Sequence, residues 1–189
     1  MAEKKADVIF HPVRMRIVQA LFGDRRLTAR QIADVLGGPS IATLYRHLNR
    51  LVRAGVIAVV EERPVRGTLE KVYALAGDQA ATFSADEVRQ FSRDEQVRNF
   101  NVLAGTLVGD YERYLGQDSF DPPSDAVVIR QKALNLTDDE ARELSGALKA
   151  AFAPYVDNPR DGARRRRMLT FLLLPLVEPA PSPSESPEE

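Results

Sequence analysis

Cysteine is absent from the 189-residue chain, and its only histidines are His11 and His47. The lack of cysteine excludes disulfides, thiolate metal sites and a cysteine nucleophile. Two histidines are too few for a His-rich metal site within one chain, so we expect no metal and no other cofactor. The chain also lacks a run of about 18 apolar residues and an apolar segment after its charged start. We therefore expect a cytoplasmic protein with no secretory signal and no membrane partner.

Catalytic motifs are also missing. The sequence contains no phosphate-binding glycine loop, no serine-centred elbow and no metal-ligand spacing. The acidic run Asp138-Asp139-Glu140 resembles paired carboxylates, but its position at the start of a predicted helix explains it. The sequence therefore does not predict an enzyme.

The net charge of -1 is an average over two unlike parts. Residues 1–75 contain 13 Lys and Arg against 7 Asp and Glu, a net charge of +6. Residues 76–189 contain the other 13 Lys and Arg against 20 Asp and Glu, a net charge of -7. Charge asymmetry of this kind indicates a nucleic-acid partner for the basic part.

The basic part has the pattern of three helices followed by a hairpin. Apolar spacing predicts helices at about 11–22, 29–36 and 39–54. In the third, Gly38 is the expected cap and Pro39 the first helical residue. Two β-prone runs, 56–60 and 69–75, then flank a segment with proline and glycine, which predicts a hairpin with a long, partly basic loop at 61–68. This order is that of a winged helix-turn-helix domain.

The second helix has a clear start and a predicted inner face. Thr28 and Gln31 form a capping box, in which each side chain bonds the backbone N–H of the other residue. Ile32, Val35 and Leu36 are the side chains that we expect to point inward.

The third helix has the features of a DNA-reading helix. Leu44, Leu48 and Leu51 form one apolar stripe, so the opposite side faces outward and is basic. Such a helix fits the major groove of B-DNA, where Arg46 could pair with a guanine and the arginines further along could hold phosphates. Including two arginines of the hairpin loop, the predicted DNA-binding residues are Ser40, Ala42, Thr43, Tyr45, Arg46, Asn49, Arg50, Arg53, Arg63 and Arg66. Tyr45 could equally pack on the hairpin, and His47 fits a structural or phosphate role.

These segments resemble the ArsR-like winged-helix transcriptional regulators over about residues 8–76. The similar stretches are Phe10–Ile17, Leu27–Ala33, Ala42–Leu48, Leu51–Gly55 and Val65–Tyr73. The resemblance implies a dimeric DNA-binding regulator, usually a repressor. Metal-sensing members use Cys or His/Asp clusters, so the missing cysteines mean that metal sensing is not carried over.

The remainder predicts a long helix and a small strand–helix–strand unit. A capping box at Ser84 opens a helix that could reach Leu115, with Gly105 and Gly109 as its weak points. A β-prone run at 126–133 precedes a further capping box at Thr137.

The helix that starts there should bury the side chains on one of its faces, namely Ala141, Leu144, Leu148, Phe152 and Tyr155. A second apolar strand is expected at 164–174. A helix between two strands suggests parallel pairing, unless another strand lies between them. The run Arg164–Arg167 fits an ion-paired strand entrance better than a second nucleic-acid patch.

The fold class we predict is α+β: a winged helix-turn-helix, a long dimerisation helix and a small strand–helix–strand unit. The predicted domains are a DNA-binding domain at 1–77, a dimerisation and possible effector region at 84–177 and a disordered tail at 178–189. The predicted function is sequence-specific regulation of transcription by a homodimer on double-stranded DNA, with a small-molecule effector that the sequence does not name. The alternative is a winged-helix protein-interaction module that does not bind DNA.

Overall fold

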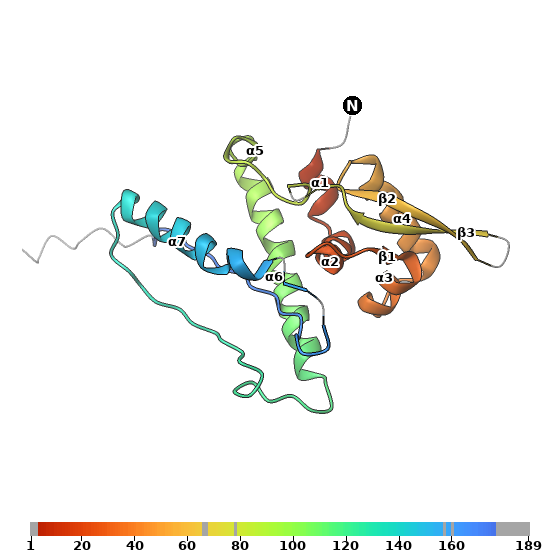
Figure 1. The fold of residues 1–189 in the computed structure, drawn as a ribbon. Coiled ribbons are helices and arrows are strands. Elements are labelled where there is room, and N and C mark those ends of the chain that lie inside the picture. Colours follow the sequence, from red (N-terminus) through yellow and green to blue (C-terminus); the bar gives the residue numbers. More distant parts are fainter. Residues whose placement is uncertain (1–3, 66–67, 78, 157, 160, 177–189) are drawn as a thin grey trace, which may run out of the picture. The chain divides into compact units, whose positions relative to one another are not determined.

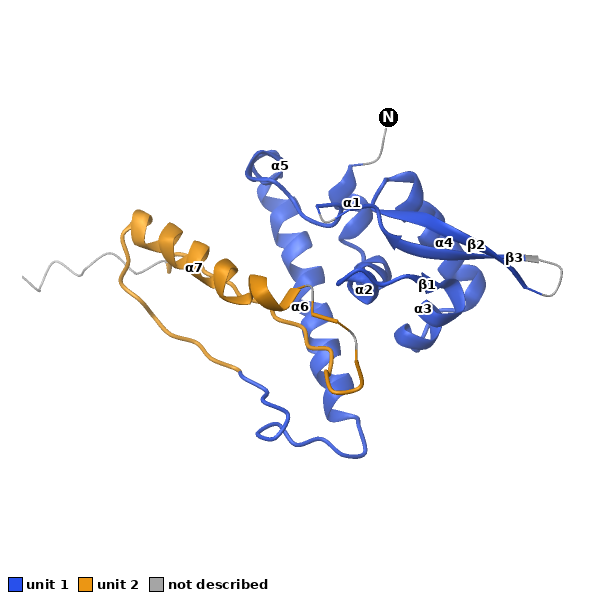
Figure 2. Cartoon of the chain, viewed as in Figure 1, with its two compact units in different colours: residues 1–128 blue, residues 129–189 orange. Residues whose placement is uncertain are grey.

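A computed structural model describes residues 4–65, 68–77, 79–156, 158–159 and 161–176. The chain forms two compact units, residues 1–128 and 129–189, which are drawn in different colours in Figure 2. In the described residues no helix is both long enough and apolar enough to cross a bilayer.

Unit 1 begins with α1 (Lys5–Ile9), α2 (Pro12–Leu21), α3 (Ala29–Leu36) and α4 (Ile41–Arg53) (Figure 1). The three helices expected in this part of the chain are α2, α3 and α4. The capping box of α3 is present, with Thr28 Oγ1 accepting from the N–H of Gln31 at 3.3 Å. The helix-turn-helix arrangement predicted here is therefore confirmed in its element order.

The predicted start of α4 was wrong by two residues. Ser40, not Gly38, is the N-cap, and its hydroxyl accepts from the N–H of Thr43 at 3.3 Å. Glycine has no side-chain acceptor for such a bond, so the serine decides where the helix begins. Gly37 ends α3 instead, with a left-handed φ of 59° that suits a residue without a Cβ.

The inner face of α3 was also partly mispredicted. Ile32 and Leu36 are buried together with Ala29, but Val35 is 45% exposed. On a helix of eight residues the buried face runs through Ala29, Ile32 and Leu36, and Val35 lies at its flank.

The hairpin consists of β2 (Ile57–Val65) and β3 (Thr68–Leu75), which pair antiparallel. A two-residue strand, β1 (Leu27–Thr28), which the sequence did not predict, pairs with the other side of β3, giving the order β1-β3-β2. The long loop expected at 61–68 was wrong, because Glu61–Val65 continue β2. A register shift between Val59 and Glu61 interrupts the ladder, and β2 continues to pair with β3 beyond it.

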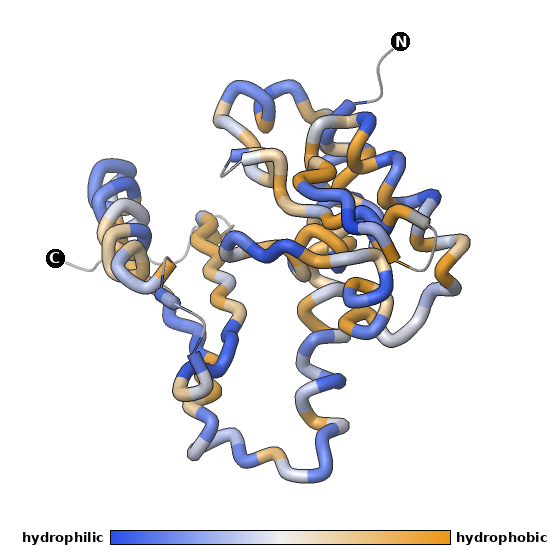
Figure 3. The backbone as a smooth tube through the Cα atoms, turned by 45° about the vertical axis from the view of Figure 1, so that its right-hand side comes forward, coloured by the Kyte–Doolittle hydropathy of each residue, from blue (hydrophilic) through white to orange (hydrophobic). Residues whose placement is uncertain are grey.

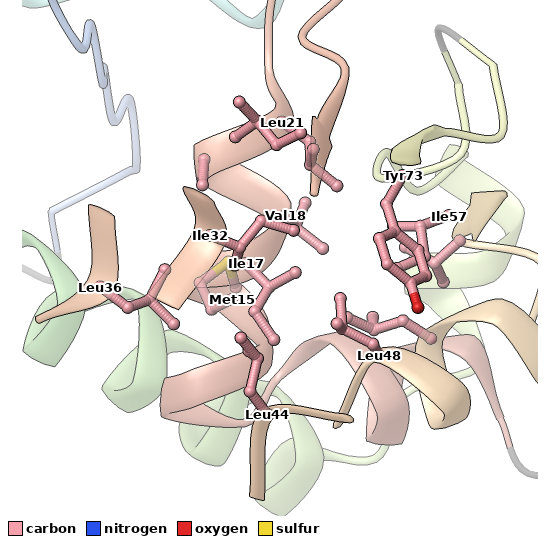
Figure 4. Packing of buried hydrophobic residues seen from close by; sticks show 14 of the residues in the cluster. Met15, Ile17, Val18, Leu21, Ile32, Leu36, Leu44, Leu48, Ile57 and Tyr73 are labelled. Atoms are coloured by element: carbon pink, nitrogen blue, oxygen red, sulfur yellow. The ribbon is translucent and has the colours of Figure 1, made fainter. Parts of the chain in front are cut away.

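The core of unit 1 lies between α2, α3, α4 and the sheet. Leu44 and Leu48 of α4 are fully buried, and Figure 4 shows them close to side chains of α2 and, for Leu48, of the hairpin. Ile17 of α2 and Tyr73 of β3 belong to the same cluster. The apolar stripe predicted on α4 is therefore confirmed.

Two helices follow the hairpin in place of the single long helix predicted from Ser84 to Leu115. They are α5 (Ala85–Arg89) and α6 (Arg93–Leu115). The capping box at Ser84 is present, but Ser92 forms a second one, with its hydroxyl accepting from the N–H of Glu95 at 3.2 Å. This second cap starts a new helix, whereas Gly105 and Gly109, the expected weak points, lie within α6, which is about 35 Å long.

Aromatic packing fixes this region to the first helices of unit 1. The ring of Phe83 stacks on that of Phe10 with centroids 5.3 Å apart, and Phe91 meets Phe83 edge-on at 5.6 Å. Lys5 of α1 adds an ion pair with Glu87 of α5 at 2.9 Å. Because α6 also packs on α2, it belongs to the same unit as the helix-turn-helix.

Of the predicted strand–helix–strand unit, only the helix is present in the described residues. Helix α7 (Asp138–Val156) follows the predicted capping box, in which Thr137 Oγ1 accepts from the N–H of Glu140 at 3.3 Å. The strands expected at 126–133 and 164–174 are not formed, because neither segment pairs with another strand in the described residues. The predicted inner face of α7 is not buried either.

The packing of α4 yields a stability prediction. Leu48→Ala should reduce the free energy of unfolding by about 2–5 kcal/mol, because the side chain is fully buried and its removal leaves a cavity. Ile41→Ala, in the same helix but at a 47% exposed position, should change it by less than about 1 kcal/mol. Urea unfolding followed by circular dichroism measures both values, and equal losses would contradict this packing.

Candidate nucleic-acid interface

One side of α4 is exposed and basic. Burial of the leucine stripe turns the other side chains away from the core. The predicted residues on this helix are exposed, apart from a half-buried Thr43; the exposed ones are Ser40, Ala42, Tyr45, Arg46, Asn49, Arg50 and Arg53. The structure thus brings together on one helix eight of the ten residues predicted to bind DNA.

A chain of hydrogen bonds orders the leading end of this face. The hydroxyl of Ser40 donates to Thr43 Oγ1 at 3.1 Å, and Arg46 Nη2 donates to the same oxygen at 3.2 Å. The guanidinium of Arg46 is therefore held towards the N-terminus of α4. The free N–H groups of a helix N-terminus favour an anion in the same place.

The trailing end of α4 carries two further arginines. Arg50 and Arg53 lie in the last turn, where positive charge offsets the negative end of the helix dipole. Arg53 Nε donates to the carbonyl of Asn49 at 3.3 Å, which keeps this guanidinium along the helix. The basic face therefore extends from Arg46 to the end of α4.

His47 lies beside this face and meets the other histidine of the chain. Its ring is tilted against that of His11, the N-cap of α2, with centroids 4.9 Å apart. His11 Nδ1 accepts from the N–H of Val13 at 3.2 Å. Burial lowers the pKa of both imidazoles, and the positive charges of Arg14 and Arg50 lower it further. The pair is thus neutral at pH 7 and joins α4 to α2.

The two arginines predicted to bind DNA from the hairpin loop are Arg63 and Arg66, and the structure describes only Arg63. Arg63 lies in β2 opposite Glu70, not in a loop as predicted. It donates two hydrogen bonds to the carboxylate of Glu61, at 2.7 and 2.8 Å. This contact raises the pKa of Arg63 and lowers that of Glu61, so both side chains stay charged and the pair has no net charge. Arg66 lies outside the described residues.

Arg14 is a structural residue that the sequence reasoning missed. Although charged, it is buried, and its guanidinium donates to the carbonyl of Asp7 at 2.9 Å and to the carbonyl of Val8. These carbonyls belong to α1, a helix of five residues that is too short to leave a periodic pattern. Nothing in the sequence next to Arg14, in the first turn of α2, indicated that its side chain would be buried against α1.

The histidine pair makes the stability of the fold depend on pH. Because each imidazole has a lower pKa in the folded chain than in the unfolded one, the unfolded chain binds protons more readily. Stability should therefore be constant above about pH 7 and decrease as the pH falls through about 6.5. Melting temperatures between pH 8 and 5.5 measure this, and His47→Gln should flatten the curve. A wild-type curve that is flat in this window would contradict the interpretation.

Comparison with known proteins agrees with the geometry. No curated protein matches the chain. A family model described as a helix-turn-helix domain matches residues 9–60, a range that contains α2, α3, α4 and the start of β2. Residues 9–60 are therefore similar to helix-turn-helix domains, the kind of domain with which transcription regulators bind DNA.

Proposed function

We propose that this protein is a sequence-specific regulator of transcription that binds double-stranded DNA as a homodimer. The observation that carries the proposal is the basic face of α4, which lies opposite a fully buried leucine stripe within the helix-turn-helix domain. Because the chain resembles the ArsR-like regulators, which are usually repressors, we propose that it represses transcription. The net negative charge of the chain lies in residues 76–189, whereas residues 1–75 carry a net charge of +6, so this basic face attracts a polyanion.

Each basic residue has a role in this proposal. Arg46, near the leading end of α4, reads a base edge in the major groove, where arginine pairs with guanine through two hydrogen bonds. Arg50 and Arg53 hold phosphates and set the register of the helix on the duplex. Arg66 of the hairpin contacts the backbone or the adjacent minor groove, whereas Arg63 does so only where a phosphate displaces the carboxylate of Glu61.

The proposed dimer uses the exposed apolar stripe of α6. The exposed apolar side chains of this stripe are Val97, Phe100, Val108, Tyr111 and Leu115. Their spacings are three or four residues, except for a gap of about two turns between Phe100 and Val108, so all five lie on one face of α6. A helix of about 35 Å with such a stripe can pair with its symmetry copy. To read two half-sites of DNA, such a dimer must hold its two copies of α4 about 34 Å apart, the repeat of one turn of DNA.

A response to a small molecule is a separate part of the proposal. A shallow groove of about 370 Å³ lies between α2 and α6 and is lined by apolar groups with two arginines, Arg16 and Arg113. Small residues of α6, Gly105, Thr106 and Gly109, also line it. A ligand there would touch both the DNA-binding domain and the proposed dimer helix.

The proposal is tested by titrating fluorescent promoter DNA at several salt concentrations. Binding should weaken steeply with salt, with a slope of log K against log[salt] of about -0.9 for each phosphate neutralised. Binding at background level, or without salt dependence, would contradict it. A protein-interaction module, the alternative, would instead hold α4 buried in a stable complex with another protein and show no DNA binding.

Arg46→Ala tests the reading role within the same titration. It should weaken binding to the preferred sequence by about 1–3 kcal/mol and relax the preference at one base pair. Arg89→Ala, which removes an exposed arginine paired with Asp86 in α5, is the matched control and should leave both unchanged. An Arg46→Ala protein with the wild-type ranking of operator variants would show that this arginine does not read a base.

Glu61→Gln tests the hairpin. It removes the carboxylate that neutralises Arg63, so the arginine becomes available to a phosphate. Binding should become several-fold tighter at low salt, and the salt slope should steepen by about one. The double variant Glu61→Gln/Arg63→Gln separates the two charges: it should lose the steeper slope. An unchanged slope in Glu61→Gln would place Arg63 away from the DNA.

A further inference from the structure

The groove between α2 and α6 has the size and lining of a small-molecule site. Its volume of about 370 Å³ lies near the lower end of the range of such sites, roughly 300–1,000 Å³, which are mostly apolar with a few polar groups. Pro12 and Val102 supply apolar side chains, and Arg16 and Arg113 supply guanidinium groups. Figure 3 shows both hydrophobic and hydrophilic residues along α6. The groove therefore suits a ligand with an apolar part and a charged part.

Two glycines of α6 make room for the groove. A Cβ added to Gly105 would meet nothing within 4 Å beyond the backbone of its own helix, so the groove is open at this point. A Cβ added to Gly109 would lie 3.3 Å from Arg113 Nη1, so the guanidinium of Arg113 lies over Gly109. Along the helix axis, Gly109 is about 10 Å from Val102. The charged and the apolar ends of the groove are therefore separated by the length of a small elongated molecule.

Two positive charges face this groove together. Arg113 donates to the carboxylate of Asp110, and Arg16 Nη2 donates to the carbonyl of Leu36 at 2.5 Å. Burial lowers the pKa of Arg16 and the charge of Arg113 lowers it further, whereas Asp110 has the opposite effect. The described residues that line the groove include no carboxylate, so the two arginines together with Asp110 have a net charge of +1. An anion bound here would reduce the repulsion between the two guanidinium groups.

A carboxylate matches these arginines. A guanidinium has five N–H donors, so each arginine can keep its present partner and also bind an oxygen of a ligand. The planar carboxylate accepts two parallel hydrogen bonds from such a fork. Its single negative charge equals the net charge of the arginines and Asp110 in magnitude, whereas a phosphate monoester carries nearly two negative charges.

We propose that this groove binds a small monocarboxylate with an elongated apolar body, and that this carboxylate is the effector of the regulator. The effector role rests on the proposed function. Arg16 connects the groove to the DNA-binding helices, because Leu36 is the last residue of α3 and Ser40 is the N-cap of α4. A carboxylate that draws Arg16 away from Leu36 alters the turn that orients α4.

Calorimetric titration of the full chain tests the site without DNA. Octanoate and 4-phenylbutyrate should each bind saturably, with one molecule per chain. Both should bind about tenfold more tightly than octanamide and 4-phenylbutyramide, because the amides lack the charge that the arginines recognise. No saturable binding of either acid, or equal binding of acids and amides, would overturn the proposal.

Gly105→Leu tests the position of the site. Leucine fills the open point of the groove and should weaken octanoate binding at least tenfold, while α6 keeps its helix because leucine is the better helix former. Gly146→Leu makes the same change at a similarly open position of α7, outside the groove, and should leave binding unchanged. Octanoate binding that survives Gly105→Leu would contradict this site.

Arg113→Gln tests the recognition of charge. It should weaken the binding of octanoate about tenfold and leave that of octanamide unchanged. Arg142→Gln is the matched control, because Arg142 of α7 pairs with Asp139 as Arg113 pairs with Asp110, three residues earlier in the chain. This control should retain the wild-type preference for the acid. If Arg113→Gln retains it too, the arginine does not bind the carboxylate and the proposal fails.

The effector role is measured by titrating promoter DNA with and without saturating octanoate. Octanoate should change the DNA affinity of the wild-type chain by about fivefold or more and leave that of the Gly105→Leu variant unchanged. An unchanged wild-type affinity would rule out the effector role. If octanoate binds as expected but DNA is not bound, the proposed function fails while the site stands. Salt-dependent DNA binding without any octanoate binding would have the opposite meaning.

Discussion

The burial of one side of α4 is the constraint from which the candidate interface follows. Leu44, Leu48 and Leu51 are fully buried, and a helix that buries one stripe must expose the opposite one. That geometry alone turns Arg46 outward, whatever its partner is. The three leucines pack against apolar side chains of α2 and of the hairpin, which belong to the same buried cluster.

Features set by neighbours in sequence could be predicted. The capping boxes at Thr28, Ser84 and Thr137 each combine a hydroxyl with a side chain three residues later, and each starts a helix in the structure. The exposed face of α4 followed from its leucine spacing. Where two local signals competed, prediction failed: Pro39 suggested an earlier start than Ser40, and the capping box at Ser92 was overlooked within a longer helical pattern.

Features that depend on distant partners could not be predicted in the same way. The position of Arg63 in a strand depends on its register with Glu70, and the buried state of Arg14 depends on the carbonyl groups of α1. The β-prone segments of unit 2 show the same limit most clearly. Their residue types favour extended backbone, but a strand exists only when another strand pairs with it.

The hydrogen bonds that link Ser40, Thr43 and Arg46 have a thermodynamic consequence for recognition. A free arginine side chain loses roughly 2 kcal/mol of rotamer entropy when it is fixed. Thr43 already restricts Arg46 in the isolated chain, so part of this loss is incurred during folding and not during binding. A base edge would then bind a guanidinium whose orientation is already restricted by Thr43. The hydroxyl of Thr43 would therefore contribute to the selectivity of the face together with the charge of Arg46.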